Sequence, residues 1–575
     1  MNHRWRYFSI AAALMLVLAA CTGTQTSSSA SASASASGGG GEPTDGGTLV
    51  FGGARLSDSL DPALTSDGES FRILRQVYET LVDLAPGSTN ELVGGLAETW
   101  EGEPDGTVYT FHLRAGVKFQ DGTDLNADAV VANFERMANF SEEFQASAYY
   151  YGQVIGFGDD SVIESVEATD DMTVVFTLKQ PNPTFLYGLV LPCFGIVSPA
   201  VLESTNADDF ENTTLTTDPV PGGTGPFILE SYTPDDNATL VRNDDYWGEK
   251  AHLDRLIIQP IADPAARLQA LQGGSIQGFD LVNPSDYGAV TDGGFQLVER
   301  LSFNTLYLGL NPSARENAAA AERTYDPPYE GESPLKDLRV RQAIEKAIDK
   351  QALIPAFYGD RGSVATTFLP ETSQWAESMA GAFTPNEFDP DGARQLLSDA
   401  GFDESNPATI HFWYPTEVTR PYMPDPAGLH QAITQMLEDV GFVVVPHSDI
   451  WDDPGYLFDG QNGMYDLHFL GWTGDWDDPG NWYGIHFAYD GDDPAVQFGC
   501  AVDGLKDALD TASGEAETTA RGEAWAQVAK LIHDNVCFVT LVHGDTALAF
   551  AQNVHGYEAN PTGSESFATV FMDAE

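Results

Sequence analysis

The stretch VYTFHLRAGVKF, residues 108–119, alternates apolar and polar side chains along its length. Tyr109, Phe111 and Leu113 would share one face of an extended chain, because successive side chains of a strand point to opposite sides. Residues 172–179 repeat the pattern. Both stretches are therefore predicted to be half-buried strands.

Helical patterns alternate with these strands. Asp337 can cap a helix whose apolar residues recur at the i, i+3, i+4 spacing of one face. Residues 391–400 and 429–440 are also amphipathic, and Gly401 and Gly441 follow them as C-terminal stops. Strands interleaved with helices indicate an α/β protein. No repeat of 20 to 50 residues is visible in the sequence, which argues against a solenoid or propeller.

The N-terminus has the pattern of a lipoprotein signal. Arg4 and Arg6 precede a short apolar run at residues 8–20, and the small residues before Cys21 are those that a signal peptidase needs. A membrane helix is the alternative, but this run is shorter than the roughly 20 residues that span a bilayer. Residues 1–21 are therefore predicted to be a signal peptide, with Cys21 as the lipidated first residue of the mature chain.

Residues 22–45 are rich in Ser, Ala and Gly and hold almost no large apolar side chain. Such a segment cannot collapse, so it is expected to be a flexible linker that holds the body roughly 25 to 30 Å from the membrane. The remaining length of about 530 residues is enough for two or three units with their own cores.

The charge balance is extreme, with 86 acidic and 27 basic residues and a formal net charge of -59. Such a field repels nucleic acid and anionic lipid, so neither is expected as a partner. The acids are scattered along the chain, which favours a solvated, soluble surface over a device that attracts cations.

Three cysteines remain after Cys21, namely Cys193, Cys500 and Cys537. At most one disulfide can form among them in an oxidising compartment, and the sequence leaves the pairing open. Cys537 stands in an apolar run, where a small buried side chain is a better interpretation than a nucleophile.

The sequence shows no pattern of an enzyme. The 11 histidines are dispersed, and neither an HExxH, an HxH nor a Gly-x-Ser-x-Gly turn occurs. Asp477 and Asp478 are adjacent acids, but such pairs are expected by chance in so acidic a chain. No catalytic residue, metal site or cofactor is predicted.

Six motifs occur in one order along the chain, and together they carry a resemblance to a known family. The chain resembles the family 5 extracellular solute-binding proteins, which include the peptide- and nickel-binding components of ABC importers. The motifs are GLAETW at 95–100, YTFHLRAGVKF at 109–119, DGT at 121–123, GTGPF at 223–227, RN and YWG within 242–248, and RVRQAI at 339–344.

The resemblance implies an α/β fold of the type II periplasmic-binding-protein kind, with two lobes and a ligand buried between them. It places lobe I at residues 46–302, with an extra subdomain, and lobe II at residues 303–536. Residues 537–575 would return to lobe I. The chain would cross near residues 303–311 and 536–543, and hinge closure is the expected motion.

Within the family, the likeness is closest to dipeptide-binding proteins. Residues 419–426, TRPYMPDP, resemble the segment whose arginine holds a peptide carboxylate, and residues 471–479, GWTGDWDDP, resemble the segment whose aspartate holds the ammonium. These roles transfer to Arg420 and Asp475. A guanidinium fork suits a carboxylate, and a charge buried by lobe closure must be paired. The alternatives are a structural salt bridge for Arg420 and a turn-forming role for Asp475.

A first-lobe loop supplies further candidates. Ser66, Asp67 and Gly68 follow the LDP motif at residues 60–62, where the family's loop reaches the ligand. Asp67 and Glu69 are more charged than the family pattern. An extra acid there would favour a basic side chain or a cationic ligand.

Trp472 and Gly474 belong to the same turn as Asp475 and are also predicted to contact the ligand. Trp472 and Trp476 can wall the cleft; the alternative for both is a place in the core.

The sequence therefore predicts a receptor, lipid-anchored on the extracytoplasmic face of the cell membrane, that binds di- or oligopeptides. Its expected partners are the permease and ATPase subunits of an ABC importer, and the receptor itself is expected to be a monomer. A nickel or metal-chelate receptor is the alternative, and His430 or His468 would then have to face the cleft. A surface sensor or a cell-wall-associated enzyme on the same scaffold is the competitor from another class.

Overall fold

The computed structural model describes residues 43–573, apart from 104–105, 235, 452–454, 491–492 and 495. Several β-sheets with helices packed on them make up this part of the chain, so the α/β prediction is confirmed. Cys21, the signal and nearly all of the linker lie outside the described residues. Every helix within the described ranges is too short or too polar to span a bilayer.

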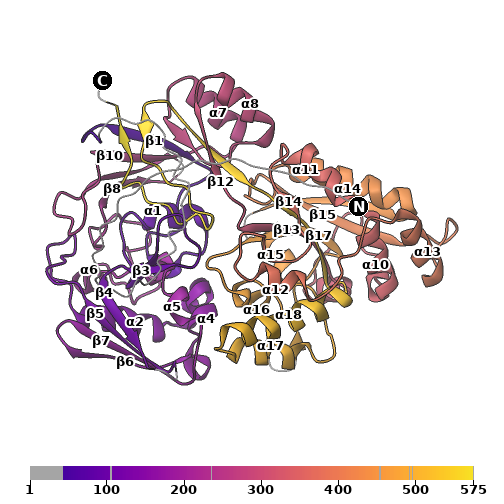
Figure 1. Ribbon diagram of the computed structural model, residues 1–575, viewed down its shortest axis with the longest axis horizontal. Helices are drawn as coiled ribbons and strands as arrows, with labels where there is room; N and C mark the ends of the chain where they lie inside the picture. The colour runs from indigo at the N-terminus through magenta and orange to yellow at the C-terminus, as the bar shows by residue number, and fades with distance from the viewer. Residues whose placement is uncertain are drawn as a thin grey trace, which may run out of the picture. The chain divides into compact units, whose positions relative to one another are not determined.

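The largest sheet has seven strands in the order β12-β21-β11-β1-β10-β9-β8. β1 pairs in parallel with β10 and β11, and the other pairs are antiparallel. Helices α7 (Pro264–Gln272) and α8 (Tyr287–Asp292) lie next to each other on this sheet (Figure 1). The strands are β1 (Thr48–Gly53), β8 (Phe227–Thr233), β9 (Asn237–Arg242), β10 (Arg255–Pro260), β11 (Gly278–Phe279), β12 (Gln296–Arg300) and β21 (Thr546–Phe550).

A four-stranded antiparallel sheet contains the two strands predicted first. Its order is β4 (Ala97–Gly102), β5 (Val108–Leu113), β7 (Thr173–Leu178) and β6 (Ile163–Asp170). Phe111 and Phe176 are fully buried, and α2 (Ala127–Ala138) packs against β6 and β7. The first prediction is wrong in its extent, because the strand ends at Leu113. Gly116 then takes a φ of +80°, a turn conformation that interrupts the extended chain.

The third large sheet has six strands in the order β14-β20-β13-β17-β15-β16. β13 is buried along its whole length, as expected for a central strand covered on both faces. The strands are β13 (Asn304–Leu310), β14 (Ser363–Val364), β15 (Thr409–Thr416), β16 (Val443–Ile450), β17 (Leu467–Thr473) and β20 (Phe538–His543).

The helices on this sheet end as their sequences predict, but the helix predicted at residues 429–440 begins three residues earlier, at Pro426. The Asp337 carboxylate accepts a hydrogen bond from the Arg339 amide and caps α10 (Leu338–Ala347). Helices α13 (Pro390–Ala400) and α14 (Pro426–Val440) end at Gly401 and Gly441, whose φ angles are +93° and +110°. These left-handed C-caps are conformations that glycine adopts without strain.

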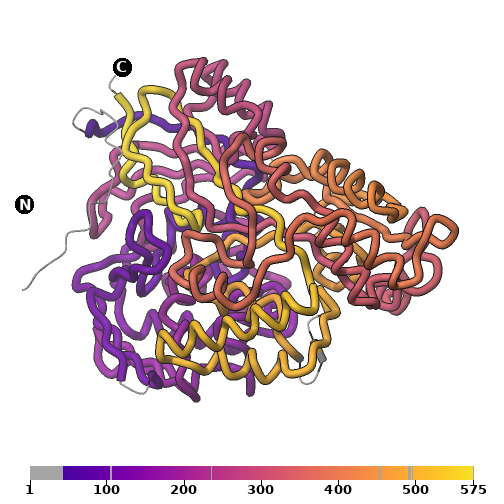
Figure 2. Tube along the Cα trace, turned by 45° about the vertical axis from the view of Figure 1, so that its right-hand side comes forward, coloured from indigo at the N-terminus to yellow at the C-terminus, as the bar shows by residue number. Residues whose placement is uncertain are grey.

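The chain passes between the seven-stranded and six-stranded sheets at two places. Residues 301–303 join β12 to β13, and Gly544 and Asp545 join β20 to β21. Hydrogen bonds join the two crossings. The Ser302 amide donates to Asp545 at 2.8 Å, and the side chain of Asn304, the first residue of β13, donates to the Gly544 carbonyl at 2.9 Å. Figure 2 shows the yellow C-terminal segment returning to the sheet that holds the indigo β1.

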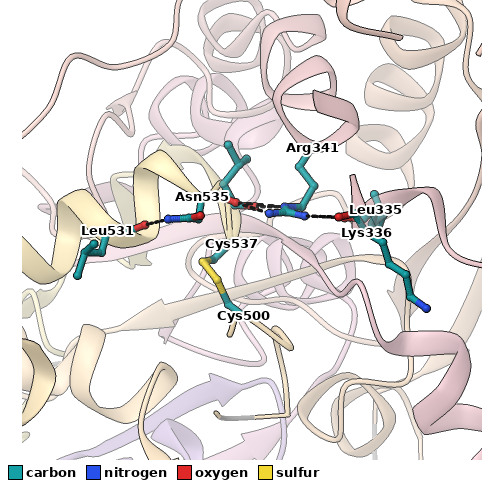
Figure 3. Close-up of a disulfide and its surroundings, with 8 residues drawn as sticks. Leu335, Lys336, Arg341, Cys500, Leu531, Asn535 and Cys537 are labelled. Atoms are coloured by element: carbon teal, nitrogen blue, oxygen red, sulfur yellow. Dashed lines mark hydrogen bonds between the residues drawn. A yellow bond between two sulfur atoms is a disulfide. The ribbon is translucent and has the colours of Figure 1, made fainter. Parts of the chain in front are cut away.

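Cys500 and Cys537 form a disulfide (Figure 3). Cys193 is free and buried. The interpretation of Cys537 as buried is confirmed, and the pairing that the sequence left open is now assigned. The bond joins the start of β20 to the segment before α17 (Leu505–Gly514) and α18 (Thr518–Asp534). It therefore closes a loop that contains both helices, which limits how far they can separate from the sheet.

Several histidines are buried in or beside the six-stranded sheet, and burial lowers their pKa because it disfavours the charged imidazolium. Neither ring nitrogen of His468 has a hydrogen-bond partner. The pKa falls to about 4 for His411, His430, His486 and His543, and to about 3 for His468.

These shifts predict that the free energy of unfolding falls by more than about 3 kcal/mol between pH 7 and pH 4.5. In that window the unfolded chain takes up protons at histidine and the folded chain does not, so stability decreases as pH falls. Denaturant unfolding at several pH values measures the effect. A His468→Leu variant should lose about 2 to 3 kcal/mol less than the parent over the same range. Parallel pH profiles for the two proteins would contradict the assignment.

Candidate functional site

Asp475 lies in the turn between β17 and the short 3-10 helix η6 (Pro479–Asn481). Its Oδ1 atom accepts a hydrogen bond from the Tyr150 hydroxyl at 2.9 Å, and its Oδ2 atom accepts one from the Asn481 side chain at 3.0 Å. The Asp475 amide donates to Asn481 Oδ1 at 2.9 Å. Tyr150 belongs to α4 (Tyr149–Val154), beside the four-stranded sheet, so partners from both halves of the body meet at this carboxylate.

Burial raises the pKa of Asp475 to about 6, although the hydrogen bonds from Asn481 and Tyr150 act in the opposite direction. No basic side chain of the described residues contributes to this pKa. The carboxylate is thus an acid with neutral donors and no counter-ion. A cation that reached it would find a charge that solvent compensates only in part.

The rest of the turn also contacts the half of the body that holds the four-stranded sheet. Trp476 is buried in the hydrophobic cluster that covers that sheet, so its side chain packs against the opposite half of the body, and its role as a cleft wall stays a prediction. The Asp477 amide donates to the Thr89 carbonyl at 3.1 Å. Three successive residues of this turn therefore contact the opposite half.

The adjacent acids Asp477 and Asp478 are engaged in holding the turn. Asp477 accepts hydrogen bonds from the Ser373 hydroxyl at 2.5 Å and the Gln374 amide at 2.9 Å. Asp478 forms a buried two-bond pair with Arg521 of α18, at 2.8 and 2.7 Å. Both carboxylates are occupied by protein donors, which makes them anchors of the turn.

Arg420 contacts an aromatic ring and no carboxylate of the described residues. Among the described residues it forms no ion pair, and its buried Nε atom has no hydrogen-bond partner. Its guanidinium stacks 4.2 Å from the centre of the Trp451 ring. A structural salt bridge, the alternative for this residue, therefore has no support in the described part of the chain.

Arg420 also borders a small cavity between the two halves of the body. The cavity has a volume of about 20 Å³ and is lined partly by the crossing residue Asp545 and by Asn283 and Pro284, which follow β11. This places Arg420 next to the segments that connect the two large sheets.

The Arg420 segment packs directly on the strand that leads to Asp475. A Cβ atom on Gly471 of β17 would lie 2.3 Å from the Tyr422 ring, so only glycine allows this approach. The Tyr422 carbonyl accepts a hydrogen bond from the Tyr358 hydroxyl at 2.8 Å, which fixes the segment. Arg420 and Asp475 form no ion pair or hydrogen bond with each other and remain separate charges.

Trp472 and Gly474 have structural contacts that their sequence did not reveal. Trp472 donates its indole N–H to Asn481 at 3.2 Å and packs edge-on against His486. Gly474 lies against Phe303, where a Cβ atom would approach the ring to 2.5 Å. The need for glycine here is thus a matter of packing, and ligand contact by either residue stays a prediction.

The first-lobe loop is built as a helix start. Asp67 caps α1 (Gly68–Leu74) by accepting from the amides of Glu69 and Ser70, and it pairs with Arg55 at 3.1 Å. Glu69 pairs with Arg72 at 3.4 Å. Both acids are already engaged, so the argument that they select a basic or cationic ligand loses its basis.

The loop is nevertheless close to the Asp475 turn. Phe71 of α1 lies against Tyr150, with ring centres 5.7 Å apart, and Tyr150 reaches Asp475. Ser66, Asp67 and Gly68 thus lie at the start of a helix that is one side chain away from the carboxylate. Their contact with a ligand stays a prediction.

The structure gives no support to the metal alternative. His430 hydrogen-bonds to the Phe412 carbonyl at 3.1 Å, and His468 packs against Gly309 within the six-stranded sheet. Both side chains are buried in the interior. Within the described ranges, no group of three or more His, Cys, Asp or Glu side chains is arranged to hold a metal ion.

Two residues of the site were missed at the sequence level, Tyr150 and Asn481. The run of three tyrosines at residues 149–151 and an asparagine two residues after Pro479 were the available signals. Neither pattern predicts contact with Asp475. For Tyr150, the contact joins residues that are far apart in the chain.

Comparison with known proteins places these features in a family. Residues 91–493 match the model of the bacterial extracellular solute-binding proteins, family 5. The chain is 29% identical to the dipeptide-binding protein of Escherichia coli strain K12, over 92% of this chain and 95% of that protein. It is 30% identical to heme-binding protein A of Haemophilus influenzae, over 92% of this chain and 93% of that protein.

A solved structure shares the fold. It is an ABC transporter-associated periplasmic binding protein from Helicobacter pylori in complex with the peptide STSA, with a TM-score of 0.76 and 26% identity. The match covers 92% of this chain and 99% of that one. The expected two-lobe fold of the periplasmic-binding-protein type is thereby confirmed.

Proposed function

Because the chain belongs to the family 5 bacterial extracellular solute-binding proteins, we propose that it captures a short peptide between its two lobes and delivers it to the permease of an ABC importer. It is a binding protein and not an enzyme, as its relatives are. The observation that supports the proposal is that, among the described residues, no cation pairs with Asp475 and no anion pairs with Arg420.

A peptide supplies both missing charges. Its ammonium group pairs with Asp475, and its carboxylate accepts two parallel hydrogen bonds from the Arg420 fork. The two side chains come from adjoining segments held by the Tyr422–Gly471 contact, so their separation is set by the protein and measures the length of the ligand. The names of two similar proteins, the dipeptide-binding protein and the structure with the peptide STSA, support this assignment.

The proposed lobes follow the sheets. Lobe I comprises residues 46–302 and 546–575, with the four-stranded sheet as its extra subdomain, and lobe II comprises residues 303–543. The return predicted at residue 537 is too early, because β20 belongs to the six-stranded sheet. The crossings at residues 301–303 and at Gly544 and Asp545 serve as the hinge, since short paired connections can absorb a rotation of one lobe against the other.

The proposed location is the extracytoplasmic face of the cell membrane. Cys21 carries the lipid anchor there, and residues 22–45 tether a monomeric body within reach of the permease. The permease and ATPase subunits of the importer are the partners in this proposal.

Native mass spectrometry of the full chain in detergent, stripped of ligand by unfolding and refolding, tests the proposal. Dipeptides, tripeptides, longer peptides and Ni²⁺ are offered separately. We expect a mass increment with di- or tripeptides, because Arg420 and Asp475 fix the distance between the two ends of the ligand. An increment with Ni²⁺ alone, or with none of the four, would refute peptide binding.

Replacing Asp475 by Asn should weaken binding of a dipeptide with a free amino group by about 2 to 5 kcal/mol, since the buried ammonium loses its counter-charge. The N-acetylated dipeptide carries no ammonium and should lose far less. Isothermal titration calorimetry with both ligands measures the difference. Equal losses for the two ligands would remove Asp475 from the ammonium site.

Arg420→Lys should not retain the affinity of the parent, although it keeps the positive charge. Lysine is a point charge without the planar fork, so a bidentate bond to the peptide carboxylate is lost, at a cost of about 1.5 to 3 kcal/mol. A dipeptide amide, which has no carboxylate, serves as the matched ligand and should respond little. Undiminished affinity for the free-acid dipeptide would argue against Arg420.

A further inference from the structure

Asn481 is bonded to both residues that flank the proposed ammonium position in this turn. Its Oδ1 atom accepts from the Asp475 amide at 2.9 Å and from the Trp472 indole at 3.2 Å. Its Nδ2 atom donates to Asp475 Oδ2 at 3.0 Å. The side chain is fully buried, so these bonds do not compete with bulk water.

The position of Asn481 is itself determined by a buried ion pair. Asp478 caps η6 by accepting from the Gly480 amide at 2.7 Å, and its carbonyl accepts from the Asn481 amide at 3.0 Å. Arg521 of α18 grips the same Asp478 carboxylate with two bonds. A chain of contacts therefore runs from α18 through η6 to the Asp475 carboxylate.

The two oxygens of Asp475 accept hydrogen bonds from different halves of the body. Oδ2 is committed to Asn481, whereas Oδ1 faces the Tyr150 hydroxyl. The titratable groups that face the carboxylate are Tyr149, Tyr150 and Cys193, all from elements packed with the four-stranded sheet, and burial raises the pKa of each. All three are neutral near pH 7, so they leave Asp475 as the titrating group of the site.

We propose that Asn481 is a positioning residue of the ammonium subsite, which holds the Asp475 carboxylate in one orientation with Oδ1 toward the ligand and orders the Trp472 indole beside it. The inference rests on the proposed peptide binding and adds a determinant for ligands with a free amino group. Asn481 acts through Asp475 and need not touch the peptide. Its hydrogen bond also favours the ionised carboxylate, which is the form that an ammonium group requires.

The test is calorimetric titration of the full chain with the dipeptide Ala-Ala and its N-acetyl form between pH 5 and pH 8. For the parent, affinity for Ala-Ala should decline below about pH 6, as Asp475 takes up a proton. Asn481→Ala should weaken Ala-Ala binding about tenfold to a hundredfold at pH 7.5, the usual effect of a lost bond to a charged group. It should also move the midpoint of the pH profile upward and change N-acetyl binding little.

Asn311→Ala is the matched control. Asn311 is also a fully buried asparagine, with bonds to the carbonyls of Gly463 and Val496. Its loss should lower stability and leave both the affinity and the pH midpoint as in the parent. Equal losses for the two ligands in Asn481→Ala, with an unmoved midpoint, would show a merely structural role and overturn the proposal.

A second variant covers the case in which Asn481→Ala does not fold. Asn481→Asp keeps the shape of the side chain and sets a second carboxylate against Asp475, so the pH midpoint should rise because two adjacent carboxylates resist joint ionisation. An unchanged midpoint would overturn the proposal. Asp475→Asn distinguishes failure of the ammonium site from failure of the Asn481 role. If Asp475→Asn weakens binding of Ala-Ala and of its N-acetyl form equally, the ammonium site is wrong, whatever the Asn481 variants show.

Discussion

A charge buried in a protein must be paired, and this constraint shapes the turn around Asp475. Asp478 meets Arg521 in a pair that is almost fully enclosed. Removing one partner of such a pair typically costs about 3 to 5 kcal/mol, because the other charge is left unpaired. The pair fixes the turn, and Asp477 is fixed by neutral donors from Ser373 and Gln374. Burial raises the pKa of Asp475 to about 6.

Beside the seven-stranded sheet, buried acids are paired with buried cations of the same protein. Arg300 donates to both Asp280 and Glu565 at 2.6 to 3.1 Å, and Arg72 adds a second cation to this network. Nearby cations keep the pKa of Asp280 low in spite of its burial. The carboxylates of Asp280 and Glu565 are already bound by arginine side chains, so they do not need a ligand to balance their charge. Asp475 differs from these acids because its hydrogen-bond donors among the described residues are neutral, which is consistent with its proposed binding role.

Local sequence determines much of the fold. Caps and stops such as Asp337, Gly401 and Gly441 act within a few residues of their own position, so the helices they bound were predictable. The proposed binding roles of Arg420 and Asp475 rest on likeness to a family, and the contacts around both side chains come from the structure. Tyr150 was not predicted because its partner Asp475 is 325 residues away, and Asn481 was not predicted because a single asparagine in a turn does not specify which neighbour it contacts.

Trp476 adds a packing contact between the two halves of the body beside the proposed ammonium site. Its indole is buried in the cluster over the four-stranded sheet, while its chain neighbour Asp475 carries the proposed ammonium site. A tryptophan buries about 150 to 250 Å², so exposing it to water costs about 4 to 6 kcal/mol at 25 cal/mol per Å². Separation of the lobes at this turn must meet that cost and also break the Tyr150–Asp475 bond. The Asp475 carboxylate is therefore enclosed while Trp476 is packed in this cluster. In the proposed complex, the same packing shields the bound ammonium group from water.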